Sequence, residues 1–169
     1  MADEFVKLII TCIYSDSAQM KIARNRLEEL WGPIDYMSPV FAFDMTDYYT
    51  AEMGAKLHRI FFSFENKISP EYCADLKITC ATIETDFLRE SGGRSVNLDP
   101  GYMDTFKYVL LSFKKGGQKI FLHDGVWADM TLMYRKGKWI PFPWTFPDFT
   151  SDRYYSELSK IRELLKIKK

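Results

Sequence analysis

The ten residues from Phe5 to Tyr14 constrain the fold more than any other stretch of the chain. They are almost all apolar, and several are β-branched. Such a run predicts a strand that is buried on both faces of a sheet, because a half-exposed strand alternates apolar and polar residues. A strand buried in this way needs other elements to cover both faces of its sheet. We therefore expect a mixed α and β protein with this strand near the centre.

Apolar periodicity and capping residues predict four longer helices. The first should begin at Asp16, with a capping box completed by Gln19, and end at Gly32-Pro33. Ser69-Pro70 is a typical start for the second. The third is expected to begin at Asp99-Pro100 and to end at Gly116-Gly117, with an apolar stripe of Met103, Phe106, Leu110 and Phe113. The fourth is expected to begin at Ser151, with an apolar stripe of Tyr154, Leu158, Ile161 and Leu165.

Six further strands are expected between these helices, over residues 36–43, 57–64, 94–98, 119–123, 126–135 and 138–142. The last three should form a hairpin-connected meander that turns at Asp124-Gly125 and Lys136-Gly137. The first six long elements have the order β-α-β-β-α-β of a ferredoxin-like unit, in which right-handed crossovers place the first and third strands centrally. The predicted fold is a single α+β domain over residues 1–169. It consists of a ferredoxin-like core extended by a helix, a three-stranded antiparallel meander and a C-terminal helix.

Composition excludes several classes of protein. The 23 basic residues are balanced by 23 acidic ones, which argues against duplex nucleic acid as a partner, because such proteins usually carry a basic excess. Three cysteines do not make a disulfide framework. No apolar run approaches the ~20 residues of a membrane span, and the acidic opening residues 1–4 differ from a secretory signal. We expect a cytoplasmic protein without a membrane partner, and we assign the basic residues 166–169 to the end of the last helix.

The common catalytic and nucleotide-binding motifs are absent from the sequence. It has no phosphate-binding loop ending in Gly-Lys-Ser/Thr, no glycine-rich dinucleotide fingerprint and no nucleophile elbow. Its two histidines, His58 and His123, and its cysteines lack zinc-binding spacing. Any site must therefore be built from less conventional groups.

Two polar stretches follow predicted strands in the first two thirds of the chain. In the first, Asp44 and Asp47 have carboxylates that suit a divalent metal such as Mg²⁺ or acid–base chemistry, although Asp47 would also serve as a helix cap. In the second, Asn97, Asp99 and Tyr102 stand where a strand meets the predicted third helix, whose free amides suit an anion. Asp99 is explained fully as the cap of that helix, so Asn97 and Tyr102 are the better ligand candidates.

Two more stretches lie in the last third. His123 titrates near neutral pH, but at a strand end before a tight turn it is more often structural. Trp144 belongs to a proline-rich segment that either forms a wall for a base or sugar or covers the core. Arg59 and Lys136 add cations, for which surface ion pairs are the simpler explanation.

Several segments of the chain are specific in combination. In order, they are Leu8-Ile9-Ile10, Ile13-Tyr14-Ser15, Trp31-Gly32-Pro33-Ile34-Asp35, Phe43-Asp44, Thr46-Asp47-Tyr48-Tyr49, Glu52-Met53-Gly54, Val96 to Tyr102, His123-Asp124-Gly125, Tyr134-Arg135-Lys136-Gly137, Pro143-Trp144-Thr145 and Pro147-Asp148. Taken together, these segments resemble the prokaryotic family catalogued as domain of unknown function 4416, and the resemblance covers nearly the whole chain. It identifies a family but not an activity. Members of the family are sometimes labelled GTP-binding proteins; because the usual phosphate loop is absent from this sequence, that label would require a nucleotide site of another design.

Three functional hypotheses follow. The first is a pocket for a nucleotide or another phosphorylated ligand, with Arg59 or Lys136 at the phosphate. In a hydrolytic version His123 is the acid–base and Asp44 holds a divalent metal, with Asp47 as a second metal ligand. The second is a non-catalytic module that binds RNA or a protein, and the third assigns only structural roles to the polar stretches. The pocket hypothesis requires its residues to converge in one cleft; they are Asp44, Asn97, Asp99, His123, Tyr48, Tyr102 and Trp144.

Overall fold

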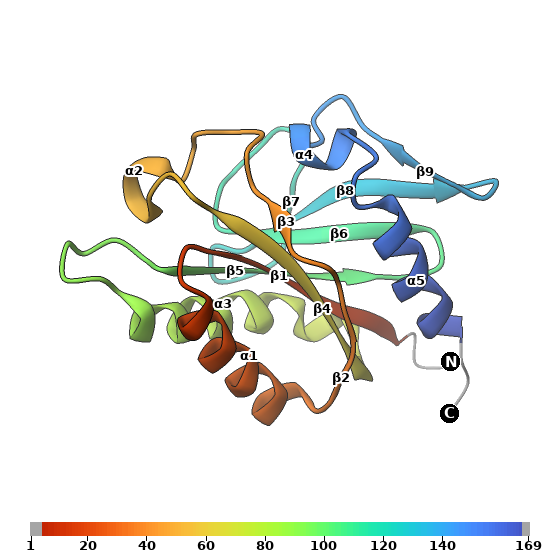
Figure 1. Ribbon diagram of the computed structural model, residues 1–169. Helices are drawn as coiled ribbons and strands as arrows, with labels where there is room; N and C mark the ends of the chain where they lie inside the picture. Colours follow the sequence, from red (N-terminus) through yellow and green to blue (C-terminus); the bar gives the residue numbers. More distant parts are fainter. Residues whose placement is uncertain (1–4, 167–169) are drawn as a thin grey trace.

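The computed structural model describes residues 5–166, which are organised by one nine-stranded sheet (Figure 1). The strands are neighbours in the order β2-β4-β1-β5-β6-β8-β7, with β3 beside β4 and β9 beside β8, and every pairing is antiparallel. Their bounds are β1 Val6–Tyr14, β2 Ile34–Met37, β3 Phe41–Ala42, β4 His58–Ile68, β5 Val96–Met103, β6 Lys107–Ser112, β7 Ile120–Phe121, β8 Trp127–Arg135 and β9 Lys138–Pro141.

Five α-helices pack around this sheet: α1 Ser17–Trp31, α2 Thr50–Met53, α3 Cys73–Glu84, α4 Pro147–Thr150 and α5 Tyr155–Lys166. Short 3₁₀ segments, Pro70–Tyr72 and Thr85–Phe87, flank α3. The acidic opening at residues 1–4 and residues 167–169 of the basic tail lie outside the described residues. Within the described chain, no helix combines the length and apolar character that crossing a membrane requires.

The first strand behaves as its sequence predicts. All nine residues of β1 are buried, and the strand pairs with β4 on one side and β5 on the other. The two polar residues in this run are accommodated within the structure: Lys7 contacts Asp35 and the Phe64 carbonyl, and Thr11 is buried opposite Asp99 in the register. The expectation of a sheet covered on both faces is therefore confirmed.

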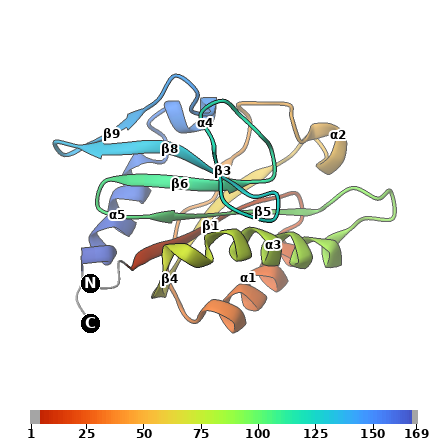
Figure 2. The ribbon, with the colours of Figure 1, turned by 180° about the vertical axis from the view of Figure 1, so that it is seen from behind.

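Two layers of helices cover the sheet (Figures 1 and 2). On one face, α1 and α3 pack over alternate residues of β1 and β4, such as Leu8, Ile10 and Phe62. On the other face, α4 and α5 cover Ile9 and Phe61 with a cluster that is rich in aromatic residues. The first helix begins as predicted, because the Asp16 carboxylate accepts from the amides of Ala18 and Gln19. The apolar stripe of the last helix is buried as predicted.

The predicted third helix is wrong. Residues 96–103 and 107–112 form the strands β5 and β6, joined by a tight turn. The turn forms because the Asp104 carboxylate accepts from the amides of Phe106 and Lys107. The spacing of the apolar residues around Leu110 fits both a helix and a strand. The segment forms a strand because its apolar residues are buried on opposite faces of the sheet. Asp99 therefore caps no helix, and Gly116-Gly117 lies in the β6–β7 connection rather than at a helix end.

Two other expectations need smaller corrections, and a third is confirmed. The predicted strand 36–43 is divided into β2 and β3, because Ser38-Pro39-Val40 leaves the ladder. The Ser151 hydroxyl donates to the Asp148 carbonyl at the end of α4, and α5 begins later, at Tyr155. The meander is confirmed: β8 pairs with β7 and β9, and both predicted turns have the left-handed backbone that such hairpins require, at Asp124-Gly125 and Lys136-Gly137.

Candidate functional site

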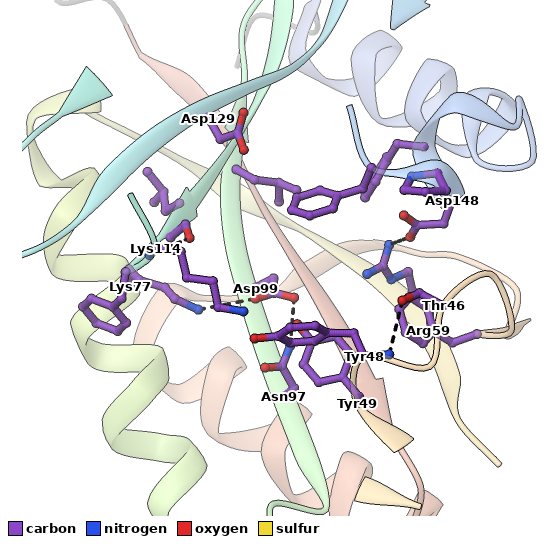
Figure 3. Close-up of a pocket in the computed structure, with 18 of the residues that line it drawn as sticks. Thr46, Tyr48, Tyr49, Arg59, Lys77, Asn97, Asp99, Lys114, Asp129 and Asp148 are labelled. Atoms are coloured by element: carbon purple, nitrogen blue, oxygen red, sulfur yellow. Dashed lines mark hydrogen bonds and ion pairs between the residues drawn. The ribbon is translucent and has the colours of Figure 1, made fainter. Parts of the chain in front are cut away.

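A cavity of about 380 Å³ lies where β5 and β6 are no longer paired with each other (Figure 3). Strand β5 pairs with β6 only over Gly101 to Met103, so the edge of its first half carries no strand partner. The wall comes from seven separate parts of the chain. Its residues are Phe43, Thr46, Tyr48, Tyr49, Glu52, Arg59, Lys77, Arg94, Asn97, Asp99, Leu110, Leu111, Ser112, Phe113, Lys114, Lys119, Asp129, Phe146, Pro147, Asp148 and Phe149.

Side chains of α3 satisfy the unpaired edge of β5. The Glu84 carboxylate accepts from the Leu98 amide at 2.5 Å, and the Lys77 ammonium donates to the Leu98 carbonyl at 3.1 Å. Both charged residues lie on the buried face of α3, where their exposed fractions are 5% and 7%. Burial raises the pKa of Glu84. The helix thus brings charged side chains to the edge of β5 that is not paired with β6.

Arg94 ties this edge to α2. Its guanidinium donates to both carboxylate oxygens of Glu52, at 2.6 and 3.0 Å, to Glu84 at 2.7 Å and to the Asn97 side-chain oxygen at 2.8 Å. The Asn97 amide in turn donates to Asp99 at 2.8 Å. The Asp99 carboxylate and burial together raise the pKa of the nearby Tyr49 hydroxyl. These bonds fix the floor of the cavity in one arrangement.

A buried ion pair forms the opposite side. Arg59 of β4 contacts Asp148 of α4, and both side chains are almost completely buried. The Arg59 guanidinium also lies over the rings of Phe43 and Phe149, 4.7 and 5.1 Å from their centroids. Figure 3 shows this pair across the cavity from Lys77 and Lys114. The pair and its aromatic contacts hold α4 against the sheet.

The β6–β7 connection brings two more lysines to the cavity. The Ser112 hydroxyl oxygen accepts from the Lys114 amide at 3.0 Å and from the Lys119 ammonium at 3.3 Å. Lys119 also lies 3.5 Å from the buried Asp129 carboxylate. The Lys114 ammonium lies 3.7 Å from the centroid of the Tyr48 ring. Burial and the charge of Lys119 lower the pKa of Lys114.

Four of the residues predicted from the sequence meet in this cavity: Tyr48, Arg59, Asn97 and Asp99. They come from segments that are far apart in the chain, so the first two polar stretches do converge. Arg59 is not in a surface ion pair, as the simpler explanation had it, but in a buried one. Asp99 faces the cavity from a strand and contacts Asn97 and Lys77.

The other predicted residues do not line the cavity, so the requirement that all of them converge is not met. Asp44 forms an exposed ion pair with Arg153 at 3.0 Å, and Asp47 is exposed before α2. His123 is exposed and lies 2.9 Å from the carboxylate of its neighbour Asp124. Tyr102 packs on the α1–α3 side, Lys136 lies in the β8–β9 turn, and Trp144 stacks on Phe142. Among residues 5–166, no three His, Cys, Asp or Glu side chains are grouped so as to hold a metal ion.

Sequence reasoning missed most of the charged residues of the cavity: Lys77, Arg94, Lys114, Lys119, Asp129 and Asp148. One signal was present in α3. Lys77 and Glu84 fall at three- and four-residue spacing with the apolar residues Cys73, Cys80 and Phe87, and a charge on an apolar stripe indicates a buried partner. The positions of Lys114 and Lys119 follow from the β5–β6 hairpin, in place of which the sequence predicted a helix.

Comparison with known proteins identifies a family but no characterised relative. No curated protein and no solved structure matched the chain. A family model described as a domain of unknown function (DUF4416) matches residues 4–165, nearly the full length of the sequence. The chain therefore belongs to the DUF4416 family.

Proposed function

We propose that the cavity binds a small molecule with an anionic group, such as a nucleotide or another phosphorylated compound. The observation that supports this most strongly is the combination, in one cavity of about 380 Å³, of aromatic rings with charged side chains from seven parts of the chain. Ligand pockets typically have volumes of roughly 300–1,000 Å³ and a few converging polar groups on an apolar wall. The cavity has this size and composition.

The charges of the wall favour an anion. Its basic residues are Arg59, Lys77, Arg94, Lys114 and Lys119, and its acidic residues are Glu52, Asp99, Asp129 and Asp148. The rings of Tyr48 and Phe146 are 61% and 50% exposed. Exposed aromatic faces of this kind support a planar base or the apolar face of a sugar.

A hydrolytic function would use different residues from those expected. His123 and Asp44 lie outside the cavity wall, whereas Asp129 lies in it and is 3% exposed. Burial raises the pKa of Asp129, which moves a carboxyl group toward the range in which it acts as a general acid. In this version of the proposal, Asp129 replaces His123 as the acid–base group.

The alternative of an RNA-binding module has less support. A sheet that binds single-stranded bases presents aromatic side chains on an open face. Here every residue of β1, and β4 from Arg59 to Phe64, is buried. We also propose that β2, β4, β1 and β5 with α1 and α3 form a ferredoxin-like core, which their neighbour order and antiparallel pairing support.

Thermal unfolding with a ligand panel tests the proposed function. The panel contains nucleotides with and without Mg²⁺, phosphorylated metabolites, the corresponding unphosphorylated compounds and a short RNA. A ligand that binds only the folded state stabilises it by about 2.7 kcal/mol at a hundredfold excess over Kd, so we expect a clear rise in Tm for one small-molecule class. Tyr48→Ala should reduce that rise, while Tyr72→Ala, an exposed tyrosine outside the cavity, should not. A rise for RNA alone, or equal effects of the two variants, would contradict the proposal.

A further inference from the structure

Three lysines border one side of the cavity, and their carboxylate partners do not fully neutralise them. Lys77 lies 3.4 Å from Asp99 and Lys119 lies 3.5 Å from Asp129. Both separations exceed the ~2.7–2.9 Å of a tight hydrogen bond between ammonium and carboxylate. Over the described part of the chain, Lys114 has no ion pair, and its ammonium rests on the Tyr48 ring. None of the three ammonium groups therefore has a tight carboxylate partner among the described residues.

The chain holds these lysines close together in spite of their repulsion. Ser112 bonds both the Lys114 amide and the Lys119 ammonium, so the connection folds back on itself. Lys114 and Lys119 both line the cavity, and burial together with the charge of Lys119 lowers the pKa of Lys114. Figure 3 shows Lys77 and Lys114 extending from different elements toward Asp99. Like charges kept together in a cavity are relieved by an anion between them.

The carboxylates beside them are poorly placed to provide that relief. Asp129 is 3% exposed, and one of its oxygens, Oδ1, is buried with no hydrogen-bond partner among residues 5–166. Burial raises the pKa of Asp129, although Lys119 opposes that rise. Asp99 is already bonded to Asn97. The ammonium groups of Lys77, Lys114 and Lys119 are therefore left, within the described chain, without a tight carboxylate partner at the cavity.

We infer that Lys77, Lys114 and Lys119 form the subsite for the phosphate group of the ligand. This inference deepens the proposed function and rests on it. A phosphate monoester or a pyrophosphate carries about two or more negative charges at neutral pH. Either group therefore supplies the negative counter-charge that the three lysines lack. The ester's organic part would then extend along the Tyr48 ring toward Arg59 and Asp148.

Isothermal titration calorimetry with defined probes tests this subsite. The probes are pyrophosphate, AMP and adenosine, each titrated into the intact protein and into the variants Lys114→Ala and Lys115→Ala. Lys115→Ala is the matched control. It removes the same charge from the adjacent residue, which is exposed and does not line the cavity. We expect AMP and pyrophosphate to bind at least tenfold more weakly to Lys114→Ala, with less than a twofold change for Lys115→Ala. Adenosine should bind the intact protein more weakly than AMP and should not respond to Lys114→Ala.

Each result has a defined meaning. Lys114→Arg, which keeps the charge, should retain most of the affinity for pyrophosphate. Equal effects of Lys114→Ala and Lys115→Ala, or no binding of pyrophosphate and AMP at millimolar concentration, would overturn the phosphate subsite. The proposed function would survive that result if another phosphorylated compound of the thermal panel raised Tm in a Tyr48-dependent way. It would fail if no anionic small molecule of the panel did so.

Discussion

At the scale of single residues, the ion pair between Arg59 and Asp148 is the feature of the cavity whose loss should be most damaging. Both side chains are nearly fully buried, and removing one partner of such a pair leaves an uncompensated charge that costs about 3–5 kcal/mol. We predict that Asp148→Asn lowers the free energy of unfolding by an amount in that range, measured by urea denaturation. The replacement of both partners, Arg59→Met with Asp148→Leu, should restore most of the stability.

The control for this prediction is an exposed ion pair that contains Asp44, a residue first expected to belong to the site. Asp44 forms an exposed ion pair with Arg153, and exposed pairs contribute about 0–1 kcal/mol. Asp44→Asn should therefore change the free energy of unfolding by less than about 1 kcal/mol. If Asp148→Asn and Asp44→Asn were equally destabilising, the prediction that burial makes the Arg59–Asp148 pair more important for stability would be wrong.

At the scale of elements, the short helix α2 depends on a side-chain contact that responds to pH. Its four residues are too few for an isolated helix to be stable, and Glu52 joins it to Arg94. The hydrogen bond from Arg94 lowers the pKa of Glu52. The stabilisation from Glu52 is therefore fully present above its unfolded pKa of about 4.3 and is lost as the pH falls through its lowered pKa in the folded state.

Comparison of Glu52→Gln with the intact protein tests this pH dependence. Because the pair is partly exposed, we expect a difference in unfolding free energy of about 1 kcal/mol or less. The difference should stay constant above about pH 5 and shrink toward zero in acid. Glu71→Gln, at an exposed position on the 3₁₀ segment before α3, should show no such trend. A difference that grew in acid would contradict the assigned sign.

The elements also show which parts of the fold the sequence could predict. The strand β1 and the helix α1 were predictable because their signals are local: an apolar run in one case, and a cap with a helical stripe in the other. The β5–β6 hairpin was missed because Asp99-Pro100 has the composition of a helix start, while its true role depends on pairing with Thr11 and Ile10 across the sheet. Local propensity is overridden by such tertiary pairing.

At the scale of the whole molecule, the cavity could be predicted only in part, because it exists only once the sheet is assembled. Its wall joins segments that are separated by up to a hundred residues, such as Tyr48 and Asp148. The polar stretches around Tyr48 and Asn97 were visible in the sequence. The position of Lys114 depends on β5 and β6 pairing over only three residues, and no local pattern encodes that register.

The same architecture predicts how stability is distributed over the molecule. The amides and carbonyls of β1 are paired with β4 and β5 on both sides, and the strand is buried throughout. The cavity-bordering segments 43–49 and 112–119 have few backbone hydrogen bonds and many exposed side chains. In hydrogen-exchange mass spectrometry, β1 should therefore exchange only through global unfolding, whereas these two segments should exchange through local opening with a much smaller free energy. A ligand bound between the two segments would restrict the local opening of both. A compound that raises Tm should therefore slow exchange in 43–49 and 112–119 together. Protection confined to the exposed β8–β9 turn would place the ligand outside the cavity.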